Sequence, residues 1–447
     1  MSAADLRSIR EIAPLVRRRE LSPVSLVEGC LARIDAKRTL NAFITVMAAS
    51  ALDEARAAEH EIASGRYRGR LHGIPISVKD LIDVAGTPTT AGSAVPPLQP
   101  TRDAEIVRRL RDAGAIIVGK TNLHEFAFGT TGEDTAFGQI RNPFDETRSA
   151  GGSSSGAAVA LVEGMCFASI GTDTGGSIRI PAAACGTVGL KGTYDEVPVR
   201  GVIPLSRTCD HVGPLARTVE DTKIVMEVLT GVPIVEPAPA PPRTFGRPTG
   251  YLNTRIDADV REAFERAVKT LESCGHRTRP VDVAHAEVTP DVYLHIVLPE
   301  ASDYHATMLA GQADKYSRNV RLRLEMGRYL LAEDYVRAMR LRDRLTAAVD
   351  AALEGCDALL LPALAIPAPV LGASTVTIDG AEEPVRAIML RLTQLFNLTG
   401  HPAIALPVGR NTDGLPLAVQ IVGRRGQTSA VVAMAAAVEA LTSPGAN

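Results

Sequence analysis

The chain lacks the cysteine arrangements that hold a structural zinc ion or a disulfide framework. Its six cysteines are widely scattered, no two of them form a C-x-x-C pair, and no histidine lies at zinc-finger spacing. These absences exclude a zinc-finger or disulfide-rich protein, and we expect buried, reduced thiols. The six are Cys30, Cys166, Cys185, Cys209, Cys274 and Cys356.

The chain also lacks an excess of charge of one sign. Its 48 basic and 51 acidic residues are interspersed and leave a formal net charge of −3. Binding to nucleic acid usually needs a basic field, so we expect no nucleic-acid partner. The hydrophobic fraction of 45% and the charged fraction of 22% are those of an ordinary soluble globular protein.

Long apolar runs are missing too. The longest ones, such as residues 156–171, are interrupted by Glu163 and fall short of the ~20 residues that a membrane span needs. Residues 1–20 alternate apolar and charged residues at helical spacing and contain no apolar core of a signal peptide. We therefore expect a cytoplasmic protein with no membrane partner.

Helical and strand patterns alternate along the chain. Residues 22–36 begin with Ser-Pro and repeat apolar residues every three or four positions, which is typical of an amphipathic helix. Residues 101–113 predict a second helix, with Asp103 in its first turn and Gly114 as its stop. The alternation predicts an α/β fold, with helices layered on a parallel or mixed sheet. Strand patterns lie at 73–80, 115–119 and 165–173.

The composition changes at one place, the proline-rich residues 232–248, which could link two domains or cross the surface of one. We favour one domain over 1–447, because strand patterns resume after this segment, at 357–367, 402–409 and 416–423. Residues 316–355 predict two consecutive helices. The expected divisions are N-terminal helices 1–65, a catalytic core 66–230, the connection 232–248, and a helical pocket region with C-terminal strands 249–447.

Two motif matches fail on their context. Residues 114–121, GAIIVGKT, satisfy the phosphate-loop pattern, but the residues between the two glycines are themselves a strand and cannot wrap a phosphate. Residues 152–156 satisfy the nucleophile-elbow pattern, with Ser154 as nucleophile and His401 among its candidate bases. An elbow must follow a buried strand, whereas the preceding residues are polar and turn-like.

Two other segments carry groups suited to catalysis. In GTDTGGS, residues 171–177, the glycines let backbone N–H groups converge, with Ser177 at the tip, although a plain glycine-rich loop has the same pattern. In GIPISVKD, strand alternation puts Lys79 near a strand end. Lys79 is either a surface charge paired with Asp80 or a desolvated, neutral base.

Seven segments, in this order and spread over nearly the whole chain, resemble the amidase signature hydrolases. The resemblance implies the α/β fold of that family, a large mixed central sheet sandwiched by helices, and hydrolysis of carbon–nitrogen bonds. The segments are GIPISVKD, AGAIIVGKTNLHEFAFG, RNPFDETRSAGGSSSGAAVALVEG, IGTDTGGSIRIPAAACGTVGLKGTY, DHVGPLARTVED, LFNLTGHPAIALPVG and GLPLAVQIVG.

The resemblance also implies roles for individual residues, beginning with a Ser-cisSer-Lys triad. Ser177 would be the nucleophile, Ser153 the bridging serine with a cis peptide bond, and Lys79 the base, which is a variant of the triad logic. No metal or organic cofactor is expected. The oxyanion hole would be formed by the N–H groups of Thr174, Gly175, Gly176 and Ser177. Ser154, Asp173 and Arg179 would support the site, and Ala127 and Phe128 would contribute to the substrate pocket.

The chain departs from the family pattern at four positions. Ser155 replaces a glycine, and we expect its side chain to cap the following helix. Gly192, Asp195 and Glu196 replace other residues in a loop expected near the site, where the two acids would alter what binds at the pocket mouth.

The resemblance leaves the substrate open. Small amides are expected, with aryl amides favoured and esters and carbamates (urethanes) as further substrates, hydrolysed by a monomer or homodimer. One alternative is the glutaminase (A-type) subunit of a tRNA-dependent amidotransferase, which would imply partner subunits. Another is a catalytically silent binding protein on the same fold.

Overall fold

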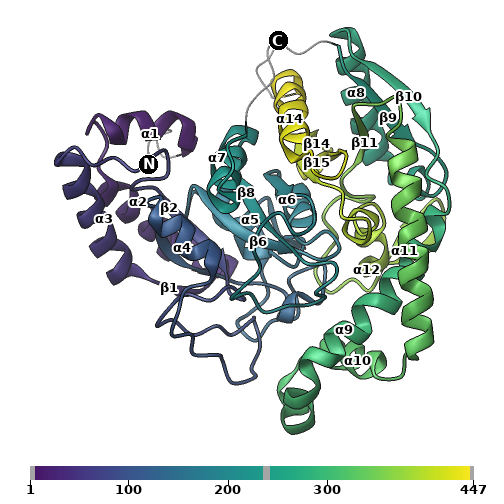
Figure 1. Cartoon of the computed structure of the whole chain (residues 1–447), viewed down its shortest axis with the longest axis horizontal. Helices are drawn as coiled ribbons and strands as arrows, with labels where there is room; N and C mark the ends of the chain where they lie inside the picture. Colours follow the sequence, from purple (N-terminus) through teal and green to yellow (C-terminus); the bar gives the residue numbers. More distant parts are fainter. Residues whose placement is uncertain (1–5, 235–241, 443–447) are drawn as a thin grey trace.

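An 11-stranded mixed β-sheet forms the centre of the fold (Figure 1). The computed structural model describes residues 6–234 and 242–442. Two short hairpins, β4 (Arg141–Asn142) with β5 (Asp145–Ser149) and β12 (Thr375–Ile378) with β13 (Ala381–Pro384), lie outside this sheet. In spatial order the strands of the large sheet are β1 (Phe43–Val46), β3 (Ile116–Thr121), β2 (Pro75–Lys79), β6 (Ala168–Asp173), β8 (His211–Ala216), β7 (Val188–Lys191), β14 (Ala403–Arg410), β15 (Pro416–Val422), β11 (Ala358–Pro362), β9 (Thr244–Pro248) and β10 (Arg277–Val281).

The strands that carry the candidate site lie inside this sheet. Strand β2 pairs in parallel with β3 on one side and with β6 on the other, and β6 pairs antiparallel with β8. Every residue of β2, β3, β6 and β8 is buried, as expected for strands covered on both faces. The Ser77 hydroxyl donates to that of Ser169 at 2.8 Å, which satisfies a polar pair between the two parallel strands.

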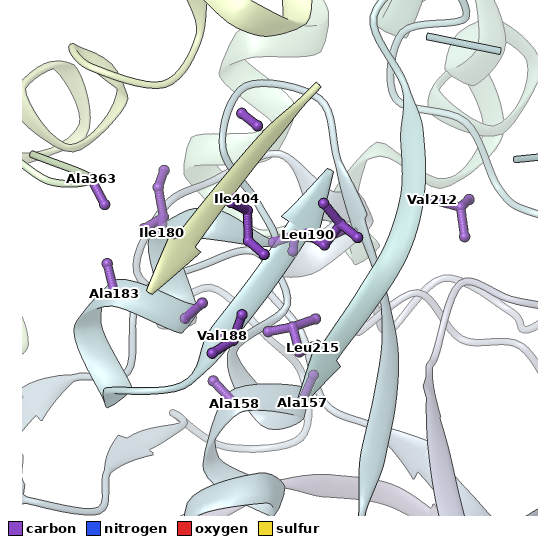
Figure 2. Close-up of a cluster of buried hydrophobic side chains, with 14 of the residues drawn as sticks. Ala157, Ala158, Ile180, Ala183, Val188, Leu190, Val212, Leu215, Ala363 and Ile404 are labelled. Atoms are coloured by element: carbon purple, nitrogen blue, oxygen red, sulfur yellow. The ribbon is translucent and has the colours of Figure 1, made fainter. Parts of the chain in front are cut away.

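Two groups of helices, α7 with α8 and α14, and α5 with α6, pack on the middle of the sheet. Helix α14 contacts α7 and α8, and all three contact strands in the middle of the sheet. On α5 and α6, the side chains of Ala157, Ala158, Ile180 and Ala183 lie against β7, β8 and β14 (Figure 2). The helices are α1 (Ile9–Arg17), α2 (Pro23–Ala36), α3 (Ala48–Ala63), α4 (Glu105–Asp112), α5 (Ser155–Val162), α6 (Arg179–Cys185), α7 (Val219–Thr230), α8 (Ala258–Ser273), α9 (Thr289–Gln312), α10 (Arg318–Gly327), α11 (Ala332–Ala352), α12 (Val385–Leu390), α13 (Leu395–Leu398) and α14 (Thr428–Thr442).

The local signals for two predicted helices agree with the structure, apart from one residue. Helix α2 begins at Pro23, and the Ser22 side chain accepts a hydrogen bond from the N–H of Val24 at 3.1 Å. Helix α4 ends just before Gly114, whose φ of +84° places it in the left-handed region. Asp103 lies outside α4 and accepts from the N–H of Ala85, so the prediction that it belongs to the first turn is wrong.

The proline-rich connection is only partly described. Residues 235–241 lie outside the described residues, and 244–248 form β9 in the large sheet, so the irregular segment ends earlier than predicted. The two consecutive helices predicted in 316–355 are α10 and α11, which pack on α9 beyond the sheet (Figure 1, green). The division of the chain into one domain with four parts stays a prediction.

All six cysteines are free thiols. Five are buried as predicted, but Cys274, at the end of α8, is exposed, which corrects the prediction for that residue. A search of the described helices finds none long and apolar enough to cross a membrane.

Candidate active site

Lys79 is a buried lysine at the end of strand β2. Its Nζ donates to Ser153 Oγ at 2.7 Å and to Thr172 Oγ1 at 2.9 Å. Asp80 instead pairs with Lys120 at 2.7 Å, so the interpretation of Lys79 as a surface charge paired with Asp80 is wrong. The backbone of β2 and β6 thus delivers the amine of Lys79 to two hydroxyl groups inside the protein.

Burial lowers the pKa of Lys79 from its ordinary value near 10.5 to about 7. The negative charges of Asp173 and Asp210 act in the opposite direction and limit the shift. At neutral pH a large fraction of Lys79 is therefore unprotonated, and a neutral amine can accept a proton from a hydroxyl group.

Ser153 lies in the glycine-serine segment that leads into α5. The peptide bond between Gly152 and Ser153 is cis. The Ser153 carbonyl accepts from the N–H of His124 at 3.1 Å, and the next N–H, that of Ser154, donates to the carbonyl oxygen of Ser177 at 3.1 Å. This last bond joins the two serine segments directly, although 24 residues separate Ser153 from Ser177 in the chain.

Ser177 lies in a tight turn that follows strand β6. The turn needs its glycines, because a Cβ on Gly175 would lie 2.5 Å from Tyr293 Oη and one on Gly176 would lie 2.3 Å from Thr393 Oγ1. Gly176 also has a φ of +138°, which side chains disfavour. Ser177 retains 6% of its surface, whereas Ser153 and Lys79 retain none, so of these three residues only Ser177 keeps an accessible surface.

The four N–H groups predicted for an oxyanion hole differ in their partners. The N–H of Gly176 donates to Asp173 Oδ1 at 2.7 Å and is therefore engaged. Those of Thr174, Gly175 and Ser177 have no hydrogen-bond acceptor within residues 6–234 and 242–442. In the described part of the chain, three donors of the turn thus remain unpaired beside Ser177.

Asp173 and Arg179 form a fully buried ion pair at 3.0 Å. Arg179 also donates to Asn397 Oδ1 at 2.6 Å and to Gln420 Oε1 at 3.1 Å. Although burial favours its neutral form, the charge of Arg179 and the hydrogen bonds to the carboxylate hold the pKa of Asp173 well below its usual range. Through Asn397 of α13 and Gln420 of β15, the ion pair fixes the Ser177 turn to these two elements. The prediction is instead that the pair holds the two serine segments in register.

Ser154 and Ser155, the two serines that follow Ser153, form no hydrogen bond with Lys79. Ser154 Oγ donates to the carbonyl of Thr172 at 3.2 Å, so it supports β6 rather than the Lys79–Ser153 contact. Ser155 is the first residue of α5, and its buried Oγ has no hydrogen-bond partner among the described residues. The prediction that Ser155 caps the helix is therefore wrong.

Sequence reasoning missed two polar groups beside the turn. Thr172 is the second hydroxyl partner of Lys79, and only strand alternation together with the pairing of β2 and β6 could have found it. Asp210 accepts from Thr174 Oγ1 at 2.6 Å and from the N–H of Leu205 at 2.9 Å. Burial raises the pKa of Asp210 to about 6 in spite of these hydrogen bonds.

Two cavities flank the turn. The first, of about 480 Å³ and here named the Thr174 cavity, is lined by Ala127, Thr172 and Thr174 and by residues 199–205. The second, of about 460 Å³, is lined by residues of α9, α10 and α12, and we name it the Arg386 cavity. Its lining includes Phe128, Tyr293, Arg323, Arg386 and Leu390.

The two residues predicted for the pocket thus line different cavities, although they are adjacent in the chain. Ala127 has a φ of +59° and Phe126 a φ of +48°, two consecutive left-handed residues that are not glycine. Such strained backbone clusters at functional sites. Here it sends the side chains of Ala127 and Phe128 to two separate walls.

None of the departures at 192, 195 and 196 is among the residues that line either cavity. The Glu196 carboxylate accepts from the N–H of Thr193 at 2.8 Å and from the Thr428 hydroxyl, so it ties its loop to the start of α14. Asp195 and Glu196 line neither cavity, and their predicted effect on what binds at the pocket mouth stays a prediction. A Cβ on Gly192 would lie 2.5 Å from Met226 Cε, which explains a glycine there by packing.

The rejected motifs have structural roles. Lys120 and Thr121 lie inside β3, as expected if GAIIVGKT is no phosphate loop. His401, the candidate base of the nucleophile elbow, contacts Thr399 and Asp350. No group of three or more histidine, cysteine, aspartate or glutamate side chains in the described part of the chain could hold a metal ion.

Comparisons with known proteins give this geometry a family. The family model described as Amidase matches residues 25–432. An amidase from Pseudomonas putida is 37% identical over 93% of this chain and 92% of its own. The A subunit of a glutamyl-tRNA(Gln) amidotransferase from Syntrophus aciditrophicus is 32% identical over 97% of this chain and 96% of its own.

A solved structure extends the likeness to the fold. The crystal structure of an amidase superimposes with a TM-score of 0.94 at 39% identity and covers 98% of this chain and 100% of its own. Family model, relatives and fold agree over almost the whole length, and the chain belongs to the amidase signature family of hydrolases that act on carbon–nitrogen bonds.

Proposed function

We propose that this protein is an amidase that hydrolyses small amides through Ser177 as nucleophile, Ser153 as proton relay and Lys79 as base. The observation that carries the proposal is the 2.7 Å hydrogen bond from Lys79 Nζ to Ser153 Oγ, made by a buried amine with a pKa of about 7. Serine is a weak nucleophile until a neighbouring base removes its proton, and this contact supplies the base.

The reaction runs in two halves. In the first, Ser177 Oγ attacks the substrate carbonyl carbon, its proton passes to Ser153 Oγ, and the Ser153 proton passes to Lys79 Nζ. The same path in reverse delivers the proton to the leaving amine as the carbon–nitrogen bond breaks. In the second half, water attacks the acyl ester through the same relay and releases the acid and Ser177.

The negative oxygen of the tetrahedral intermediate needs hydrogen-bond donors. The unpaired N–H groups of Thr174, Gly175 and Ser177 are the candidates, while Gly176 holds the turn through Asp173. One such donor contributes roughly 10²- to 10³-fold to a rate. Asp173 and Arg179 act as positioning residues, because their hydrogen bonds fix the backbone of the turn.

Both cavities beside the turn carry apolar side chains, which suits an acyl group on one side of the scissile bond and an amine on the other. We expect aryl amides to be good substrates, with esters and carbamates as further ones. A second candidate function is that of a glutaminase subunit, because the amidotransferase relative matches 97% of the chain. The third alternative, a silent binding protein, would leave the Lys79–Ser153 contact without a use.

The test is amine or alcohol release from one aromatic acyl or alkoxycarbonyl group linked as amide, ester or carbamate, with glutamine as a further substrate. Ser177→Ala should abolish turnover of every linkage. Ser155→Ala is the matched control, because it removes a buried hydroxyl from the neighbouring cluster, and it should keep wild-type turnover. Full activity in Ser177→Ala would overturn the triad, and turnover of glutamine alone would favour the amidotransferase role.

A further inference from the structure

The Arg386 cavity contains an arginine without a partner. Arg386, in the short helix α12, makes no hydrogen bond or ion pair with any residue of the described ranges 6–234 and 242–442, and its Nε is buried. Its guanidinium faces the ring of Phe128, 6.0 Å from the centroid. Arg386 as a whole is half-buried, and a partly buried charge without a counter-charge carries a cost that a ligand of opposite charge would remove.

A second arginine enlarges the positive charge at this wall. Arg323 of α10 lies 5.8 Å from the centroid of the same Phe128 ring and donates to the Phe128 carbonyl at 2.7 Å. Burial, together with the positive charge of Arg386, lowers the pKa of Arg323 to about 10, which leaves its guanidinium charged at neutral pH. Burial also lowers the pKa of Arg386, and arginine side chains keep their charge in proteins. The two arginines share one aromatic ring, and the carboxylate of Asp134, which accepts from Asn319 of the lining, acts on Arg323. Arg386 forms no ion pair with a carboxylate of the described residues.

The other charged residues of the lining do not neutralise this pair. Glu383 is the acid of the lining, and it forms an ion pair with Arg255, which lies outside the lining. Arg391 is a third arginine of the lining, but its guanidinium is already engaged by the carbonyls of Tyr251 and Thr254 and stacks on the Tyr251 ring. Among the described residues of the lining, Arg386 is therefore the arginine whose positive charge has no partner. Arg323 adds a second positive charge beside it.

Two side chains of the lining lie beside the turn that carries Ser177. Tyr293 and Leu390 line the cavity, and these are the side chains that a Cβ on Gly175 would touch, at 2.5 and 3.1 Å. Toward solvent the lining includes Leu322 and Met326, which are about half exposed. In the binding pose that we consider, the acyl chain enters past these two residues, with its far end toward Arg386 and its carbonyl toward Gly175.

We propose that the Arg386 cavity binds an anionic group, a carboxylate in particular, at the far end of the substrate's acyl chain. A guanidinium presents parallel N–H donors that match a carboxylate, and such charge-assisted bonds are the strong ones. The substrates would then be monoamides of dicarboxylic acids and related acyl groups with a terminal acid. This inference rests on the proposed amidase function and names the class of substrate that the same site prefers.

The test compares anilides of succinic, glutaric and adipic acid with neutral anilides in which an isopropyl group replaces the terminal carboxylate. Wild type should hydrolyse one of the three acids about 10- to 100-fold more efficiently in kcat/KM than its neutral counterpart, as expected for hydrogen bonds to a charged group. Arg386→Met, which keeps the length of the aliphatic stem and removes the guanidinium, should reduce this ratio to near one through a loss of kcat/KM for the acid. Arg391→Met removes an equal charge from the same lining and should keep the preference.

Binding to the Ser177→Ala variant gives a readout that does not depend on turnover. Calorimetric titration with each of the three monoanilides and with its isopropyl counterpart should show the same preference as catalysis, and the added Arg386→Met change should remove it. Equal affinity within all three pairs would overturn the inference even if every anilide is hydrolysed. A binding preference without hydrolysis of any anilide would instead count against the amidase function and leave the anion site standing.

Discussion

Asp80 Oδ1 lies 2.7 Å from Lys120 Nζ, and both side chains are fully buried between strands β2 and β3. Asp80 directly follows Lys79 in the chain, but its carboxylate forms an ion pair with Lys120 instead. Had Asp80 paired with Lys79, the attraction would have raised the pKa of Lys79 and kept it protonated. The Asp80–Lys120 pair therefore allows burial to dominate at Lys79.

The activity should depend on pH through Lys79. Because burial places the pKa of Lys79 near 7, and the base must be unprotonated, we expect kcat/KM to fall about tenfold per pH unit below about 7 and to be level above it. The measurement is kcat/KM for a neutral anilide from pH 5 to 9. A profile that is flat through this range would show that no group with this pKa acts as the base.

Thr172→Val should move that profile. The Thr172 hydroxyl accepts a hydrogen bond from Lys79 at 2.9 Å, which favours the charged amine, so its removal should lower the pKa of Lys79 further. The midpoint of kcat/KM against pH should shift to lower pH, together with a loss of rate from poorer positioning. An unchanged midpoint would mean that Thr172 is only a packing residue.

Asp173→Asn should destabilise the protein strongly. The substitution leaves Arg179 charged and buried without a counter-charge, which costs about 3 to 5 kcal/mol in comparable pairs. Urea unfolding should show this loss as a lower midpoint. The matched control is Asp35→Asn, which breaks the exposed pair of Asp35 with Arg38 and should change the midpoint little, so equal effects would contradict the prediction.

Ser155→Ala should stabilise the protein. The buried Ser155 hydroxyl has no hydrogen-bond partner among the described residues, and alanine removes the unsatisfied group without adding volume. We expect a gain of about 1 kcal/mol in the free energy of unfolding, measured by urea denaturation. A loss of stability would indicate that a water molecule or a small shift satisfies the hydroxyl.

Much of this fold could be predicted because its signals are local. The apolar run of β2, the Ser-Pro start of α2 and the glycine stop after α4 each depend on neighbouring residues. The family motifs brought Lys79 and Ser153 together in the prediction, and the structure places them in contact.

What the sequence could not predict depends on distant pairing. Asn397 and Gln420 accept hydrogen bonds from Arg179 although they are more than 200 residues away in the chain, and no local sequence pattern predicts these contacts. The contact of Glu196 could not be predicted for the same reason, because its partner Thr428 is more than 200 residues away in the chain. Ser155 resembles a cap in sequence, yet the helix begins one residue too early for it.

Because the backbone at Phe126 and Ala127 is left-handed, the adjacent residues Ala127 and Phe128 line different cavities, the Thr174 cavity and the Arg386 cavity. Enlarging residue 127 would narrow the Thr174 cavity, whereas shortening Phe128 would widen the other and remove the ring that Arg323 and Arg386 face. In the proposed amidase, two adjacent residues would therefore contact different halves of the substrate, and selectivity for one half could change by a substitution that leaves the other cavity intact.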